Sequence, residues 1–428
     1  MGFVEEASSS TQRLNPPPKP TEESPLLSNS KLSSNSKTFA NVLIAIVGAG
    51  VLGLPYTFKR TGWVMGLLML WAISALTYHC MMLLVYTRRK LESVLGFVEI
   101  GSFGDLGAIV CGPIGRIAVD FMIVFAQSGF CVGYLIFTAN TLVNLLNSPV
   151  SGDDLVGLLW GFKPRTMYIW GCLPFQIGLN SIRTLTHMAP LSIFADIVDV
   201  GAMGVVVVKD VIIIAEQRPV AKAFGDLSAL LYCVGVAIYC FEGVGMVLPL
   251  ESETKDKKKY GKVVFLTMLS IAFTYGAFGV LCYFAFGERT KEIVTANFGP
   301  GVINTLVQLG LCINLFMTFP LMMNPVYEIV ERYFTGGRFC LWLRWLMVLL
   351  VCLVAISVPN FTDFLSLVGS SICCLLGFVL PSLFHLLVFK EEVGWKGVSS
   401  DIVIMILGIV FAISGTWYSL TEMFSDKV

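Results

Sequence analysis

The chain has 428 residues, of which 56% are apolar and only 14% are Asp, Glu, Lys or Arg, whereas a soluble domain carries about 25% charged residues. This composition excludes a soluble enzyme with one membrane anchor, and at about 20 apolar residues per span it leaves room for at most about twelve membrane-spanning helices. Because 29 basic residues balance 29 acidic ones, we expect no general attraction to nucleic acid and no nucleic-acid partner.

The first 37 residues differ from the rest of the chain. They are rich in Ser, contain three consecutive prolines at 16–18 and have no apolar run longer than a pair, which is typical of disorder. We therefore predict a disordered tail at 1–37 and a membrane domain at 38–428. Within the tail, Glu22, Leu26 and Leu27 match an acidic dileucine sorting signal, which a sorting adaptor reads only on the cytoplasmic face.

From Lys37 onward, long apolar segments alternate with short polar breaks. Apolar runs of more than about 20 residues favour helices over barrel strands, because a helix pairs its own backbone groups inside the bilayer. We predict an all-α integral membrane protein with eleven spans. They lie at 38–58, 63–87, 116–146, 167–182, 188–214, 226–250, 261–286, 300–328, 341–358, 362–388 and 401–423.

The distribution of Lys and Arg between the two sides of this map predicts the orientation. Most of the 29 basic residues fall on the side of the tail, and basic residues gather on the cytoplasmic side of membrane proteins. The tail is therefore expected in the cytoplasm, and an odd number of spans places the C-terminus on the lumenal side.

Two spans contain a similar glycine-rich break. The first span has the sequence GAGVLGLP at 48–55 and the sixth has EGVGMVLP at 242–249. Gly costs about 1 kcal/mol and Pro about 3 kcal/mol in a helix interior relative to Ala, so we predict that both helices are broken. Each break opens a set of five spans, which indicates a five-plus-five inverted repeat with one extra helix. The alternative is that these residues only allow close helix packing, but two matching breaks favour the repeat.

At this point the residues resemble a known family. The run 48–55 followed by Tyr56, the triplet 241–243, and the run 127–131 with Tyr134 in the third span resemble the amino acid/auxin permease family. Within that family the resemblance is to plant vacuolar amino-acid transporters and animal proton-coupled amino-acid transporters. It covers essentially everything after the tail, and it implies eleven helices, ten of them in an inverted repeat, and secondary transport of amino acids.

An unwound segment inside the membrane is tolerable only if something satisfies its backbone groups. Free N–H groups after the first break suit a carboxylate, and free carbonyls before it suit an ammonium group, so a zwitterionic amino acid fits both. The candidate backbone contacts are Gly48, Ala49, Gly50, Val51 and Leu52, and the candidates that close the side-chain pocket are Tyr239, Phe241 and Gly243. The only charge beside either break is Glu242, so we expect neutral cargo, with cationic cargo possible if Glu242 points into the pocket.

The coupling ion is predicted from a departure from the family pattern. Sodium-coupled relatives carry an Asn where this chain has Ile44, and although Thr318 offers one oxygen, a hard cation needs several. Some animal proton-coupled relatives carry a His where this chain has Asn41. Glu242 is the most central ionisable residue, so we assign proton coupling to it. The alternative is that Glu242 only caps free N–H groups of the broken helix.

Other function classes lack support in the sequence. It contains no phosphate-binding loop, no paired-His metal motif and no nucleophile with a recognisable base, so we predict no enzyme activity, no cofactor and no metal site. An amino-acid sensor with the same fold, or a sodium-coupled carrier, remains an alternative. The resemblance and the dileucine together favour a vacuolar or lysosome-like membrane.

Overall fold

The computed structural model describes residues 33–96, 100–146, 163–182, 189–217, 220–226, 229–299, 301–392 and 394–425. The predicted sorting-signal residues Glu22, Leu26 and Leu27, and most of the predicted tail, lie outside the described residues. Within the described part the protein is all-α, as predicted. An isolated β-bridge joins Ser33, just before the first helix, to Thr254.

The helices follow the predicted spans in order. They are α1 (Asn35–Ile46), α2 (Leu54–Thr61), α3 (Trp63–Leu95), α4 (Phe103–Leu146), α6 (Pro164–Asn180), α7 (Ala189–Gln217), α8 (Leu230–Cys240), α9 (Val244–Ser252), α10 (Tyr260–Phe286), α11 (Val302–Thr335), α12 (Leu341–Ser357), α13 (Phe361–Val368), α14 (Leu380–Phe389) and α15 (Trp395–Ser425). Among the described residues, seven helical stretches are long and apolar enough to cross a membrane, and the bent pair α1 and α2 makes an eighth. α12 is a shorter apolar helix, and α6 and α7 occupy the predicted fourth and fifth spans.

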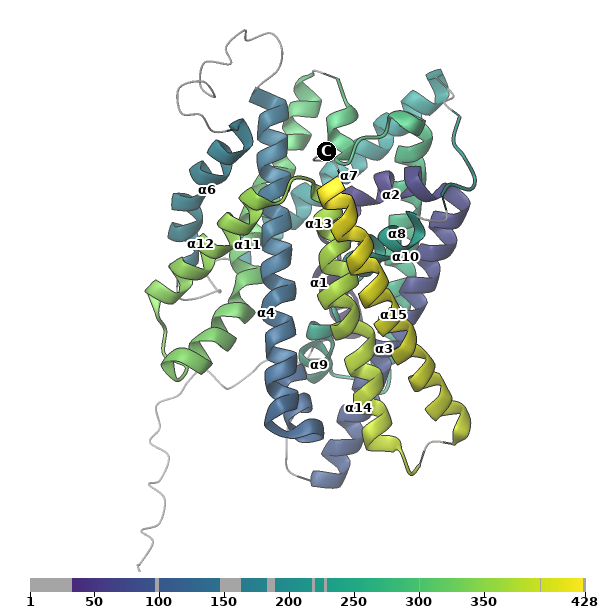
Figure 1. Cartoon of the computed structure of the whole chain (residues 1–428), viewed down its shortest axis with the longest axis vertical. Coiled ribbons are helices and arrows are strands. Elements are labelled where there is room, and N and C mark those ends of the chain that lie inside the picture. Colours follow the sequence, from purple (N-terminus) through teal and green to yellow (C-terminus); the bar gives the residue numbers. More distant parts are fainter. Residues whose placement is uncertain are drawn as a thin grey trace, which may run out of the picture.

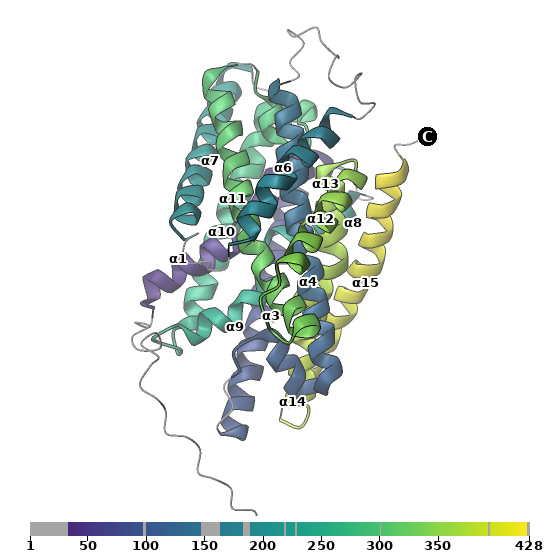
Figure 2. The ribbon, with the colours of Figure 1, turned by 90° about the vertical axis from the view of Figure 1, so that its left-hand side faces the viewer.

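Most helices run along the long axis of the molecule (Figure 1). α11 packs against α4 and α7, and the last helix, α15, packs against α8, α13 and α14. α7 and α15 therefore lie on opposite sides of the bundle, as the second view shows (Figure 2). The broken helices lie between these outer layers, where many of their residues are buried.

Both predicted breaks are present. α1 ends at Ile46, and a 3-10 turn at Ala49–Gly53 leads into α2 with a bend of 51°. Pro55 lies in the first turn of α2, where a missing N–H costs nothing. In the sixth span α8 stops at Cys240 and α9 starts at Val244, so that the two half-helices lie at different heights in Figure 1.

Two irregularities were not predicted. α4 contains Gly112 with a φ of 67°, a conformation that favours glycine, so a short helix precedes the third span, whose start we predicted at 116. The tenth span is interrupted by π-helical segments at Gly369–Cys373 and Leu375–Val379 between α13 and α14. Such segments are frequent at functional sites.

Candidate functional site

The two breaks face one cavity of about 450 Å³. Its wall comes from α1, α4, α8, α9 and α11 together with the break residues. Of the predicted site residues, the cavity is lined by Gly48, Ala49, Gly50, Tyr239, Glu242 and Gly243. These residues come from positions almost 200 apart in the chain, and the fold brings them together because each break interrupts a helix in the middle of the bundle.

Three predicted contacts do not line this cavity: Val51, Leu52 and Phe241. Val51 and Leu52 belong to the 3-10 turn beyond the break, and both are buried in the hydrophobic core. The ring of Phe241 packs on Tyr275 with the ring centroids 5.6 Å apart. The structure therefore narrows the set of candidate contacts to the residues at the breaks themselves.

The cavity opens toward the side on which α1 begins, called here the tail side. Along α1 the lining residues run from Asn41 to Gly50, and their exposure falls from 47% at Ile44 to 4% at Ala49. The lining residues on α9 and α11 extend toward the tail-side ends of those helices, as far as Leu250 and Pro325. The buried turn after Gly50 closes the opposite side.

The first break leaves backbone donors without a protein partner. The N–H of Val51 donates to the carbonyl of Gly48 at 3.3 Å, but within the described part of the chain no partner is recorded for the N–H groups of Ala49 and Gly50. These groups start a helical segment, where the positive end of the helix dipole lies. A carboxylate is the group that such donors bind best.

The second break is covered by its own side chain. The Glu242 carboxylate faces the backbone N–H groups of Gly243, Val244 and Gly245 and interacts favourably with them, so it lies at the start of α9. The side chain is half-buried and lines the cavity. This is the position that the capping alternative for Glu242 requires.

Two glycines allow the breaks to pass close to each other. A Cβ on Gly50 would lie 3.1 Å from the backbone Cα of Cys240, at the end of α8. A Cβ on Gly243 would lie 2.6 Å from Ile46 Cγ1, at the end of α1. By contrast, a Cβ on Gly48 would meet only the Tyr134 hydroxyl, at 3.7 Å. Gly50 and Gly243 are therefore packing residues as well as cavity residues.

The cavity also contains buried polar side-chain atoms, one of them on the predicted pocket residue Tyr239. Gln127 Oε1 and the Tyr239 hydroxyl are buried and have no hydrogen-bond partner among the described residues. Gln127 was named above only as part of the run 127–131 that resembles the family. A buried amide inside a membrane span is itself a signal of function. The Asn314 side chain, also on the wall, bonds to the Thr318 hydroxyl at 3.1 Å.

Two positions of the cavity wall bear on sodium coupling. Ile44, where sodium-coupled relatives carry an amide, lines the cavity with an aliphatic side chain. The Thr318 hydroxyl is already bonded to the carbonyl of Asn314 at 2.9 Å. Over the part of the chain that the structure describes, no group of three or more His, Cys, Asp or Glu side chains is arranged to hold a metal ion.

Comparisons with known proteins agree with this geometry. Residues 31–421 match the family described as transmembrane amino acid transporter protein. The chain is 64% identical to Amino acid transporter AVT3C of Arabidopsis thaliana, with 100% of both chains covered. It is 27% identical to Vacuolar amino acid transporter 3 of Saccharomyces cerevisiae, covering 91% of this chain and 56% of the yeast protein. The solved inward-facing conformation of Mhp1 has a TM-score of 0.56 and 15% identity over 92% of this chain and 90% of its own, which shows a shared fold.

Proposed function

The chain belongs to the transmembrane amino acid transporter family, and we propose that it carries neutral amino acids across an intracellular, vacuole-type membrane. The observation that carries this proposal is that two broken helices face one cavity. In transporters built from inverted repeats, the substrate binds at such breaks and the two halves rock around it. The predicted resemblance to the amino acid/auxin permease family is confirmed by the comparisons.

The zwitterion fits the polar atoms of the cavity. Its carboxylate binds the N–H groups of Ala49 and Gly50, for which the described part of the chain supplies no partner. Its ammonium group binds Gln127 Oε1 and the Tyr239 hydroxyl, which can act as acceptors. Glu242 faces the backbone N–H groups at the start of α9, which already compensate its charge, so it is poorly placed to pair with a cationic side chain. Neutral amino acids are therefore the proposed cargo.

Proton coupling at Glu242 is part of the proposal. A protonated carboxyl accepts fewer hydrogen bonds than a carboxylate, so proton binding weakens the cap on α9 and links the charge state to the position of a half-helix that lines the cavity. Sodium coupling is the alternative, and the aliphatic Ile44 weighs against it. A sensor that shares the fold and the site is the other alternative.

Flux through liposomes tests these proposals together. The purified full chain should take up labelled neutral amino acid without sodium, and a pH gradient that is acid on the side opposite the tail should stimulate the uptake. Proton and sodium gradients are imposed separately, with protein-free liposomes as the control. Sodium-dependent uptake that ignores pH would overturn the coupling assignment, and binding without flux would favour a sensor.

The membrane and the orientation are proposed from the relatives and the tail. A yeast relative is named as a vacuolar transporter, and we place the tail in the cytoplasm and the C-terminus in the lumen. If Glu22, Leu26 and Leu27 form a sorting signal that an adaptor reads, then changing both leucines to Ala should redirect a tagged protein to the cell surface. An unchanged location would remove the signal from the proposal.

A further inference from the structure

A basic turn connects α9 and α10 on the tail side. The turn spans residues 253–259, and together with the start of α1 it lines an open hollow of about 820 Å³ at the surface. The hollow is separate from the cavity at the breaks. It is lined by Ser34, Asn35, Ser252, Thr254, Lys255, Asp256, Lys257 and Lys258, so it combines hydroxyl groups with ammonium groups.

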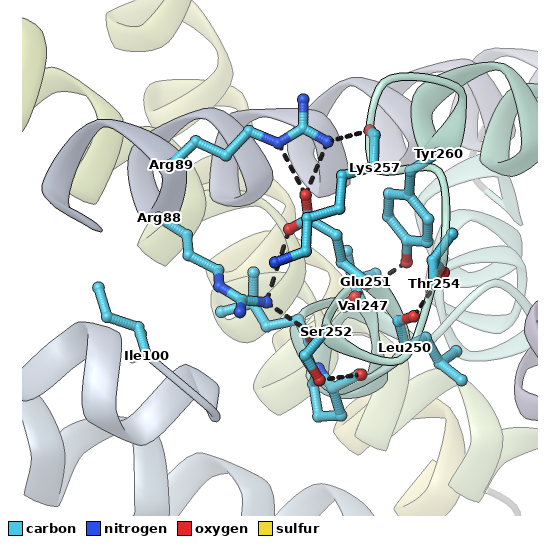
Figure 3. A network of polar contacts seen from close by, with 12 residues as sticks. Arg88, Arg89, Ile100, Val247, Leu250, Glu251, Ser252, Thr254, Lys257 and Tyr260 are labelled. Carbon is cyan, nitrogen blue, oxygen red and sulfur yellow. Dashed lines mark hydrogen bonds and ion pairs between the residues drawn. The ribbon is translucent and has the colours of Figure 1, made fainter. Parts of the chain in front are cut away.

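The turn is held in place from α3, at the C-terminal end of that helix. Arg89 donates to Glu251 at 2.7 Å and to the backbone carbonyl of Lys257, and Arg88 donates to the carbonyl of Leu248 at 2.8 Å (Figure 3). Glu251 is buried between these two guanidinium groups. The hollow is therefore a built feature of the fold with a fixed backbone.

The start of α1 is attached to the same turn. The N–H of Ser33 donates to the carbonyl of Glu253 at 2.8 Å, and the N–H of Lys255 donates back to the carbonyl of Ser33 at 3.1 Å. The hydroxyls of Thr38 and Thr254 lie 3.2 Å apart and share a hydrogen bond. A ligand in the hollow would thus contact both α1 and the end of α9, the two half-helices that line the cavity.

The charge of the hollow is unbalanced. Asp256 pairs with Lys259 at 3.2 Å, and the hydrogen bond from Lys259 lowers the pKa of Asp256, so this carboxylate is ionised and already engaged. Lys255, Lys257 and Lys258 are exposed, and no ion pair is recorded for their ammonium groups among the described residues. The other carboxylate in the turn, Glu253, is exposed and does not line the hollow.

We propose that this hollow binds the phosphorylated headgroup of a membrane lipid in the tail-side leaflet. α9 and α10 end at the turn, so the hollow lies at the level of the lipid headgroups, and lysine clusters in this position attract anionic lipids. The Lys ammonium groups, together with the Ser34 hydroxyl and the Asn35 amide beside them, are donors that suit phosphate oxygens. Three lysines with no recorded ion pair favour a headgroup that carries more than one phosphate. They favour phosphatidylserine less, because its headgroup has a single net negative charge.

Binding to the purified full chain tests the proposal without any need for transport activity. The probes are a short-chain phosphatidylinositol bisphosphate, short-chain phosphatidylserine, and free inositol trisphosphate, each titrated in detergent at physiological salt. The test variant changes Lys255, Lys257 and Lys258 to Gln. The matched control changes Arg338, Lys390 and Lys396 to Gln, because these residues are also exposed on the tail side but lie outside the hollow.

We expect the bisphosphate lipid to bind at least tenfold more tightly than phosphatidylserine and to raise the melting temperature of the protein. The hollow variant should lose at least tenfold in affinity, and the control variant should stay within twofold of the wild type. If both variants lose affinity equally, then the lipid is attracted by the total positive charge of the tail side, and the proposed site is overturned. Free inositol trisphosphate that binds as tightly as the lipid would overturn the lipid as the ligand.

Discussion

The two breaks share a sequence pattern and one cavity, yet they differ in what covers their backbone donors. At the first break the structure records no protein partner for the N–H groups of Ala49 and Gly50 among the described residues. At the second break the Glu242 carboxylate faces the N–H groups of Gly243, Val244 and Gly245. The second break thus has a carboxylate from its own side chain beside its backbone donors, and the first break has none among the described residues. This difference suggests that the first break receives the substrate carboxylate while the second responds to charge.

The largest effect is expected from Gly50→Val, which fills the first break. The side chain would block a carboxylate from the backbone and would also press on the backbone of Cys240, 3.1 Å from the new Cβ. We expect uptake to fall at least about 100-fold and the melting temperature to fall as well. Because of the contact with α8, this variant tests packing as well as substrate binding.

Gly48→Ala is the matched control for this variant. Its Cβ would meet only the Tyr134 hydroxyl at an ordinary 3.7 Å, so the fold and the melting temperature should be retained. Uptake and thermal unfolding measured on both variants separate lost packing from lost binding. Normal uptake by Gly50→Val would place the substrate elsewhere and remove the contrast between the breaks.

Changes at Glu242 test the second break. Glu242→Gln keeps an oxygen for the cap but cannot release a proton, so substrate exchange should persist while stimulation by the pH gradient falls about tenfold or more. Glu242→Ala removes the cap and should lower the free energy of unfolding by about 1–2 kcal/mol. If the Gln variant keeps its pH stimulation, then the proton binds elsewhere and Glu242 is only a cap.

A smaller effect is expected from Gln127→Leu. The amide oxygen is buried on the cavity wall without a protein partner in the described structure, so its loss should cost substrate binding and little stability. We expect KM to rise about tenfold with an unchanged melting temperature. Ser128→Ala is the control, because Ser128 also has a buried, unpaired oxygen but does not line the cavity. An equal rise in KM for both variants would contradict a direct contact.

The smallest effect is expected from Gly245→Ala. Gly245 lines the cavity and lies in the first turn of α9, but no heavy atom lies within 4 Å of a Cβ built there. Uptake should stay within about twofold of the wild type. Replacing a helical Gly by Ala should raise the free energy of unfolding by up to about 1 kcal/mol. Loss of uptake here would show that the second break also approaches the substrate closely.

The positions of the helices, and the places where two of them are broken, could be predicted from the sequence. Apolar run length predicts a span because the bilayer has a fixed thickness, and Gly with Pro predicts a break because both weaken helices. The path of the backbone beyond a break is decided by packing, so the sequence does not reveal that Val51 and Leu52, predicted as backbone contacts, lie away from the cavity wall.

Long-range polar contacts were beyond the reach of sequence patterns. Glu251 pairs with Arg89, which lies more than 160 positions earlier in the chain, so no short sequence pattern reveals the contact. The π-helical segments of the tenth span depend in the same way on close contacts: a Cβ on Gly369 would lie 1.9 Å from the carbonyl oxygen of Gly235. Such contacts exist only after the bundle has formed.

The reciprocal approach of the breaks sets a rule for how this protein can vary. Gly50 lies against Cys240 and Gly243 lies against Ile46, so each glycine shares its space with a residue of the opposite repeat. A larger side chain at 243 should be accepted only together with a smaller one at 46. Position 50 has less freedom, because the backbone of residue 240 cannot be made smaller. Paired substitutions at 46 and 243 should therefore be viable where either single change is not. These two positions are thus expected to change together rather than independently.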